Sequence, residues 1–311
     1  MFSIHKTLTI DEEEIFTAGS KLLGPQTSPL RSLGVFIRSR HFKVFSYVID
    51  TALGLFIASK GLPPPVPALM ALLAVFALAT AVYVFNDLED EEVDRLNVPD
   101  RPLPSGQITK RDAKIIASLS AFTALGLSIL LSVETFVLCS ICLIIGYAYS
   151  TRSVHLKENT YAKIIVPAIG SALAIIIGGS ALGTISSHIL LAACSFFLFV
   201  IAMAPIFDLK DVTGDREKGV MTVPVLKGPE FSLRFAVAFM FLIPGFTYLA
   251  YLWRVVGLLG PVLMGLFCLA NIVVMLPLLS KWRDPDFCQK TEKKIFLVSV
   301  LIQLTLVLQT L

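Results

Sequence analysis

Long apolar runs separated by short polar segments make up most of this chain of 311 residues. Runs of this length predict membrane-spanning helices, because a helix needs about 20 apolar residues to cross the hydrocarbon layer. We predict nine spans, at residues 42–60, 67–86, 113–132, 135–150, 161–183, 188–207, 231–252, 257–279 and 294–311. A polar break at 132–134 predicts a tight turn between the third and fourth spans. The expected fold class is all-α, with a multi-pass membrane domain over residues 42–311 and an N-terminal segment at 1–41.

The distribution of basic residues supports this number of spans. Nine spans place the N-terminal segment and every second loop on one side, and 24 of the 26 Lys and Arg residues fall there or at the adjoining span edges. Lys60 and Arg254 are the exceptions. The positive-inside rule assigns the basic side to the cytoplasm. Because residues 1–41 contain an acidic run and no early apolar core, we expect a cytoplasmic segment there rather than a signal peptide.

Two acidic clusters share one spacing, and each follows a predicted span on the basic side. They comprise Asp87, Asp90 and Asp94 after the second span, and Asp208, Asp211 and Asp215 after the sixth. Positions i, i+3 and i+7 lie on one face of a helix, so each cluster is expected to present its carboxylates together. Because both clusters belong to the same side of the membrane, they can face each other across the mouth of one cavity.

Crowded carboxylates repel one another unless a cation lies between them. Oxygen ligands suit Mg²⁺, which usually keeps positions for water and for substrate phosphate. The facing clusters therefore predict magnesium ions bridged by a diphosphate. Solvated charges at helix ends are the alternative for any single carboxylate, but they do not account for two clusters with matched spacing on one side.

The clusters and their flanks resemble the UbiA superfamily of intramembrane prenyltransferases. The first cluster, with Asn86 in front of it, fits N-D-x-x-D-x-x-x-D, and the second fits D-x-x-D-x-x-x-D. The flanks RPLPSG at 101–106 and GDREKG at 214–219 match as well, and Tyr149 and Lys157 look like a Tyr and a Lys that recur in the family. The resemblance implies nine helices around a central cavity, a cytoplasmic cap, and Mg²⁺-diphosphate binding by the Asp motifs.

The resemblance and the charges together indicate roles for further side chains. An allylic diphosphate leaves with its bonding electrons, and basic side chains can help to neutralise the leaving group. The catalytic or diphosphate-binding candidates are Arg101, Lys157, Lys210 and Arg216, with Asn86 as a diphosphate contact and Tyr149 as a catalytic group. Anchoring at the membrane surface is the alternative for each basic residue.

Asp50 lies in the middle of the first predicted span. An ionisable residue there is costly and usually faces the interior of the bundle. We expect Asp50 to line the cavity and to contact the acceptor or steady a cation, with a paired structural carboxyl as the alternative. Many members of the family carry an Asn in this helix, but the stretch 39–43 has none, so the acceptor contacts of this helix are not implied.

These features predict a Mg-dependent enzyme that transfers a prenyl group from a polyprenyl diphosphate to a lipid-soluble acceptor through an allylic cation. The flanks resemble the archaeal ether-lipid and chlorophyll-synthase branches, so a glycerol-phosphate lipid or an aromatic or chlorin ring is the expected acceptor. A terpene cyclase and a cation-gated transporter stay open as alternatives. Membrane lipids are expected partners and nucleic acid is not. Prenyl length, acceptor identity and oligomeric state stay open.

Overall fold

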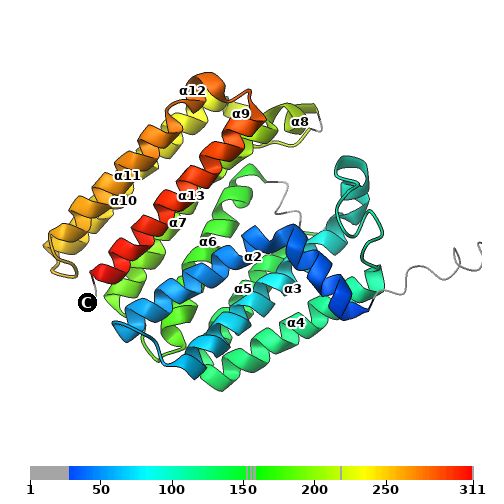
Figure 1. The fold of residues 1–311 in the computed structure, drawn as a ribbon, viewed down its shortest axis with the longest axis horizontal. Helices are drawn as coiled ribbons and strands as arrows, with labels where there is room; N and C mark the ends of the chain where they lie inside the picture. The colour runs from blue at the N-terminus through cyan, green and yellow to red at the C-terminus, as the bar shows by residue number, and fades with distance from the viewer. Residues whose placement is uncertain (1–27, 152, 155, 157–158, 218, 310–311) are drawn as a thin grey trace, which may run out of the picture.

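The computed structural model describes residues 28–309 except 152, 155, 157, 158 and 218, and every regular element in that part of the chain is a helix (Figure 1). The long helices are α2 (Pro29–Ser59), α3 (Pro65–Asn97), α4 (Lys110–Leu131), α5 (Val133–Ser150), α6 (Thr160–Ser180), α7 (Ser187–Phe207), α10 (Pro229–Leu252), α11 (Leu259–Met275) and α13 (Pro285–Leu308). The short ones are η2 (Asp208–Asp211), α8 (Val212–Glu217), α9 (Val223–Lys227) and α12 (Leu278–Lys281).

Eight helices of the described residues are long and apolar enough to cross a membrane, which confirms an all-α, multi-pass membrane protein. The ninth predicted span falls on α13, which lies outside these eight. Its first half is charged, with Glu292, Lys293 and Lys294 directly before the apolar stretch. Helix α13 still packs against α11 and α7, so it belongs to the same bundle.

The predicted break between the third and fourth spans is confirmed. Helix α4 ends at Leu131 and α5 begins at Val133. The side chain of Ser132 accepts a hydrogen bond from the Thr135 N–H at 3.0 Å. This N-cap satisfies a donor that the first turn of α5 would otherwise leave unpaired.

The first helix starts well before the predicted span. The side chain of Ser28 caps it by accepting a hydrogen bond from the Arg31 N–H at 3.3 Å. About two turns after Ser28, Phe36 is buried in a hydrophobic cluster with Leu103 from the loop after α3. Residues 29–41, expected in the N-terminal segment, are thus part of α2 and hold that loop in place.

The helices form two groups that meet at α6. Figure 1 shows α7, α10, α11 and α13 on one side and α2, α3, α4 and α5 on the other, and α6 packs against both α2 and α7. Helices α2 and α6 approach very closely, because a Cβ at Gly54 would lie 1.9 Å from the carbonyl oxygen of Ile175. A Cβ at Gly178 would lie 2.1 Å from the carbonyl oxygen of Thr51. Small residues allow such backbone contact, which drives helix association within a membrane.

Candidate active site

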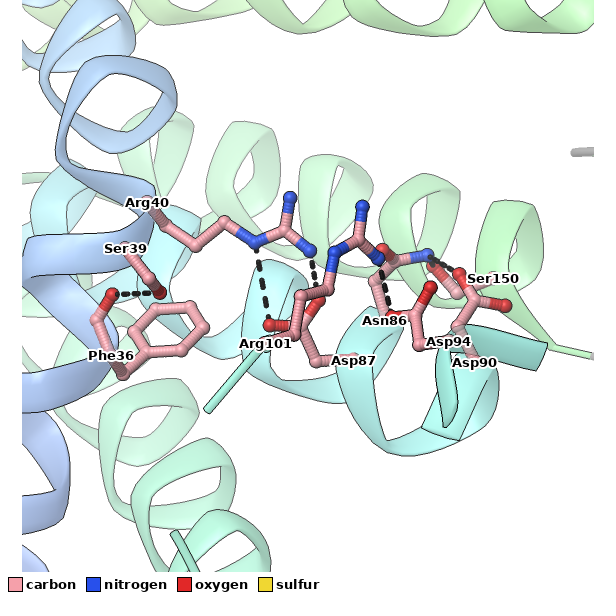
Figure 2. A network of polar contacts seen from close by, with 9 residues as sticks. All are labelled: Phe36, Ser39, Arg40, Asn86, Asp87, Asp90, Asp94, Arg101 and Ser150. Atoms are coloured by element: carbon pink, nitrogen blue, oxygen red, sulfur yellow. Dashed lines mark hydrogen bonds and ion pairs between the residues drawn. The ribbon is translucent and has the colours of Figure 1, made fainter. Parts of the chain in front are cut away.

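The first acidic cluster lies on the last turns of α3, beyond the apolar part of that helix. Figure 2 shows Asp87, Asp90 and Asp94 following one another along the helix. Asp87 is 7% exposed and Asp94 is 6% exposed. Carboxylates buried to this degree need cations or hydrogen-bond donors around them.

Two arginines supply the missing positive charge (Figure 2). Arg40 on α2 contacts both oxygens of Asp87, pairing through Nη2 and donating from Nε at 3.4 Å. Arg101, in the loop after α3, pairs with Asp94 through Nη1. The sequence argument named Arg101 and missed Arg40. In the described structure both guanidinium groups engage the acidic cluster itself.

Asn86 and Tyr149 connect the first cluster to α5. The Asn86 amide donates to Asp90 Oδ2 at 3.1 Å and lies 3.3 Å from the Ser150 hydroxyl. Tyr149, next to Ser150, is close enough to interact electrostatically with Asp90 and with Asp208 of the second cluster. A carboxylate of each cluster, far apart in sequence, therefore lies near Tyr149.

The spacing argument assumed that the second cluster continues α7 as a regular α-helix. The structure shows a different local geometry there. Residues Asp208 to Asp211 form the 3-10 helix η2, and Asp215 lies on α8. Tightening to three residues per turn is common at the ends of α-helices, and it places positions i and i+3 directly above one another. Asp208 and Asp211 thus still point to one side.

The second cluster brings its own carboxylates close together. Asp208 lies near Asp211 and Asp215, which repel its charge, while Lys163 and Lys210 are the nearby cations. Asp211 is exposed. Carboxylates that repel one another in this way form a site that attracts a cation.

No three Asp, Glu, His or Cys side chains of the described residues are close enough together to hold a metal ion. In the first cluster, the guanidinium groups of Arg40 and Arg101 occupy the carboxylate oxygens instead. The donor set fits Mg²⁺ nonetheless, because it consists of carboxylate and amide oxygens on facing elements.

The remaining basic candidates differ in their contacts and in their exposure to solvent. Lys210 pairs with Glu292 of α13 at 3.0 Å, which ties the second cluster to the last helix. Burial raises the pKa of Glu292, which precedes the apolar half of α13, and the Lys210 ammonium opposes that shift. Arg216 is exposed on α8. Lys157 lies outside the described residues.

An apolar cavity of about 120 Å³ begins one helical turn from the first cluster. It lies between α2, α3, α5 and α6, with Tyr83 and Tyr149 nearest the acidic residues and Tyr47 on the α2 side. Val75 and Ile177 line its deeper part. The site is therefore amphiphilic, with charged groups at the mouth and an aliphatic interior.

Asp50 is not among the residues that line this cavity. It is 5% exposed, accepts a hydrogen bond from the Ser171 hydroxyl of α6, and accepts a second from the Gln303 amide of α13 at 3.4 Å. The structure thus places Asp50 in a polar contact between three helices, α2, α6 and α13.

The sequence contains a pattern that could have predicted that α2 contributes polar side chains to the interior of the bundle. Arg40, Lys43, Tyr47 and Asp50 recur at intervals of three and four residues, which puts them on one helix face. Polar residues at this interval in a spanning helix indicate a face directed into the bundle rather than toward lipid.

A helical membrane bundle with two acidic clusters above an aliphatic cavity defines an integral membrane enzyme for amphiphilic substrates. The family pattern of UbiA prenyltransferases matches residues 47–300, and the chain belongs to this family of prenyltransferases. The chain is 29% identical over 193 residues to the digeranylgeranylglyceryl phosphate synthase of Sulfurisphaera tokodaii, covering 61% of this chain and 68% of that protein. It is 27% identical over 245 residues to the enzyme of the same name from Methanococcus aeolicus, covering 78% and 85%.

Solved structures share the fold. A structure of digeranylgeranylglyceryl phosphate synthase superposes with a TM-score of 0.73 at 22% identity, covering 91% of this chain and 99% of that one. A UbiA homologue from Archaeoglobus fulgidus, bound to GPP and Mg²⁺, gives a TM-score of 0.66 at 18% identity, covering 88% and 99%. A protein of this fold has thus been seen with Mg²⁺ together with GPP, and in another structure with Mg²⁺ together with DMAPP.

Proposed function

We propose that this prenyltransferase moves a geranylgeranyl-type group from its diphosphate to a glycerol-phosphate lipid, with Mg²⁺ as cofactor. The observation that carries the proposal is that Tyr149, which lines the aliphatic cavity, lies near both Asp90 and Asp208, so both acidic clusters adjoin one cavity. The choice of acceptor is supported by the relatives from Sulfurisphaera tokodaii and Methanococcus aeolicus, both named digeranylgeranylglyceryl phosphate synthase.

The acidic clusters would hold the metal. The proposed ligands are Asp87, Asp90, Asp94, Asp208, Asp211 and Asp215. When bound there, Mg²⁺ supplies charge neutralisation for the departing diphosphate. Arg40 and Arg101 now neutralise the carboxylates of the first cluster, so metal binding would free their guanidinium groups for the phosphate oxygens. A planar guanidinium contacts phosphate through two parallel hydrogen bonds, which suits this second role.

The reaction is a substitution at an allylic carbon. The bond between this carbon and the diphosphate oxygen breaks, and its electron pair leaves with the diphosphate. A hydroxyl oxygen of the acceptor then forms a new bond to the carbon and loses its proton. The chain's own contribution is to orient the two substrates and to hold positive side chains beside the leaving group.

The cavity would hold the prenyl tail and protect the cationic carbon from water. Its lining is aliphatic apart from a few groups such as Tyr83 and Tyr149 at the acidic end. Aromatic faces stabilise a nearby cation by a few tenths to about 2 kcal/mol, and more when water is excluded. Lys210, Lys157 and Arg216 are further proposed contacts of the diphosphate. The basic loops support a charged mouth on the cytoplasmic side.

The test uses the full chain in lipid nanodiscs with geranylgeranyl diphosphate and Mg²⁺. One sample also contains a glyceryl phosphate ether lipid that carries a single geranylgeranyl chain, and one contains no acceptor. We expect an ether lipid with two chains, detected by mass spectrometry, and diphosphate release that depends on the acceptor. A cyclic hydrocarbon or alcohol formed without acceptor would contradict the proposal and favour a terpene cyclase.

A further inference from the structure

We infer that Lys43 binds the phosphate group of the acceptor lipid, at a subsite separate from the metal-diphosphate site. The inference rests on the proposed function, because it requires a phosphorylated acceptor. It concerns a residue that neither acidic motif contains, on the helix where the usual Asn of the family is missing. Its support comes from the position of Lys43, from the charges around it, and from the pairing of its neighbours.

The position of Lys43 is at the mouth of the cavity. Its Nζ lies 5.9 Å from the centroid of the Tyr83 ring, which lines the cavity. On the same face of α2, Arg40 contacts the first acidic cluster one turn earlier, and Tyr47 lines the cavity one turn later. Lys43 therefore stands between the acidic cluster and the aliphatic interior.

The charges around Lys43 are mostly positive. Arg40, Arg101 and Lys210 are close enough to repel its ammonium group, and Asp87 attracts it. Lys210 belongs to the second cluster, whereas Arg40 and Arg101 pair with the first. Lys43 is therefore near basic residues of both clusters. A cation held among three other cations is unfavourable unless an anion joins them.

The neighbouring cations already have carboxylate partners. Arg40 pairs with Asp87, and Lys210 pairs with Glu292. Arg101 likewise pairs with Asp94 of the first cluster. Lys43 forms no ion pair with any residue that the structure describes, and its ring contact with Tyr83 leaves the charge without a counter-anion. Of these four basic residues, Lys43 is thus the one without a carboxylate partner in the described part of the chain, which leaves it for a second anion besides the diphosphate.

The chemistry of the acceptor matches this position. A phosphate monoester carries a charge of about −1.5 to −2 near neutral pH, whereas the donor's diphosphate is assigned to the metal and the acidic clusters. An ammonium group binds phosphate as a compact point charge without demanding a fixed orientation. With its phosphate on Lys43, the acceptor would lie beside the diphosphate, with its hydroxyl directed to the carbon at the cavity mouth.

The test compares Lys43→Gln with wild type in nanodiscs, with separate KM values for the acceptor and for the diphosphate donor. We expect the KM of the acceptor to rise about 10- to 100-fold, the range for losing a hydrogen bond to a charged group, while the donor KM stays the same. Lys43→Arg should recover most of the acceptor affinity. Arg38→Gln, which removes an exposed charge from the same helix, is the matched control and should leave both KM values unchanged.

Two further measurements test whether a higher acceptor KM in Lys43→Gln comes from weaker binding of the acceptor's phosphate. Equilibrium binding of the radiolabelled acceptor without Mg²⁺ should weaken in Lys43→Gln, which gives a readout independent of turnover. An acceptor analogue that lacks the phosphate should bind the variant and wild type equally. Equal acceptor KM values in the two proteins, or a rise confined to the donor KM, would overturn the inference. If wild type does not use the phosphorylated acceptor at all, the proposed function fails instead.

Discussion

The two acidic clusters have the same sequence spacing but different surroundings. In the first, Asp87 and Asp94 are buried and each is paired with an arginine. In the second, Asp208 lies beside two other carboxylates, and Asp211 is exposed. Matched motifs can therefore differ in how far the protein itself neutralises them.

The difference indicates a division of labour between the clusters. The first is organised by contacts that reach α2, the loop after α3, and α5, so its geometry is set before any ligand arrives (Figure 2). The second stands on a short 3-10 helix and on α8, with repulsion among its carboxylates. We propose that the second cluster gains more than the first from a bound cation.

The largest expected effect is the loss of turnover in Asp87→Asn and Asp208→Asn. Each change removes one negative charge from a different cluster, and each should lower kcat/KM by about 100- to 1,000-fold, as for other groups that stabilise charge in a transition state. Mass spectrometry of the lipid product in nanodiscs measures the effect. Full activity in either variant would exclude that cluster from the diphosphate site.

The next largest effect is a difference in the free energy of unfolding between a variant of the first cluster and a variant of the second. Asp87→Ala leaves Arg40 buried without its partner and should lower the free energy of unfolding by about 3 kcal/mol. Asp208→Ala removes repulsion and should leave stability unchanged or slightly higher. Thermal and denaturant unfolding of the detergent-solubilised protein, followed by intrinsic fluorescence, compares the two.

A double variant serves as the control for this stability difference. Arg40→Met with Asp87→Leu replaces the buried ion pair by apolar side chains of similar size and should recover most of the lost stability. Equal destabilisation by Asp87→Ala and Asp208→Ala would show that the two clusters do not differ in the proposed way.

A third effect tests where a divalent cation acts. Mg²⁺ with inorganic diphosphate at about 100 times its dissociation constant should stabilise wild type by about 2.7 kcal/mol, because the ligands bind only the folded state. The stabilisation should disappear in Asp208→Asn and persist in Arg38→Gln. Unchanged stabilisation in Asp208→Asn would place the cation away from the second cluster.

The smallest effect is expected at Asp50, a carboxyl outside both clusters. In Asp50→Asn the amide can keep one of the contacts with Ser171 and Gln303, so stability should fall by about 1 kcal/mol, the value of a single hydrogen bond. Turnover and product pattern should not change. A loss of turnover comparable to that of Asp87→Asn would return Asp50 to the site.

The helices and the acidic spacing were predictable because both depend on local sequence. An apolar run of spanning length forms a helix in a membrane whatever its neighbours are, since the backbone must satisfy its own hydrogen bonds there. The break at Ser132 was predictable for the same reason, because a cap acts within one turn. The start of α2 at Pro29 was not, since it depends on Phe36 packing under the loop that contains Leu103.

By itself, the sequence thus determined the fold class, most of the spans and the residues of both acidic motifs, all of which follow from composition and from spacing along one helix. Only the tertiary structure decided that Arg40 neutralises Asp87, that Tyr149 lies near a carboxylate of each cluster, and that Asp50 accepts a hydrogen bond from Ser171. These contacts join residues far apart in sequence. They are set by how closely the helices pack, as at the glycines between α2 and α6, and helix packing leaves no local periodic signal.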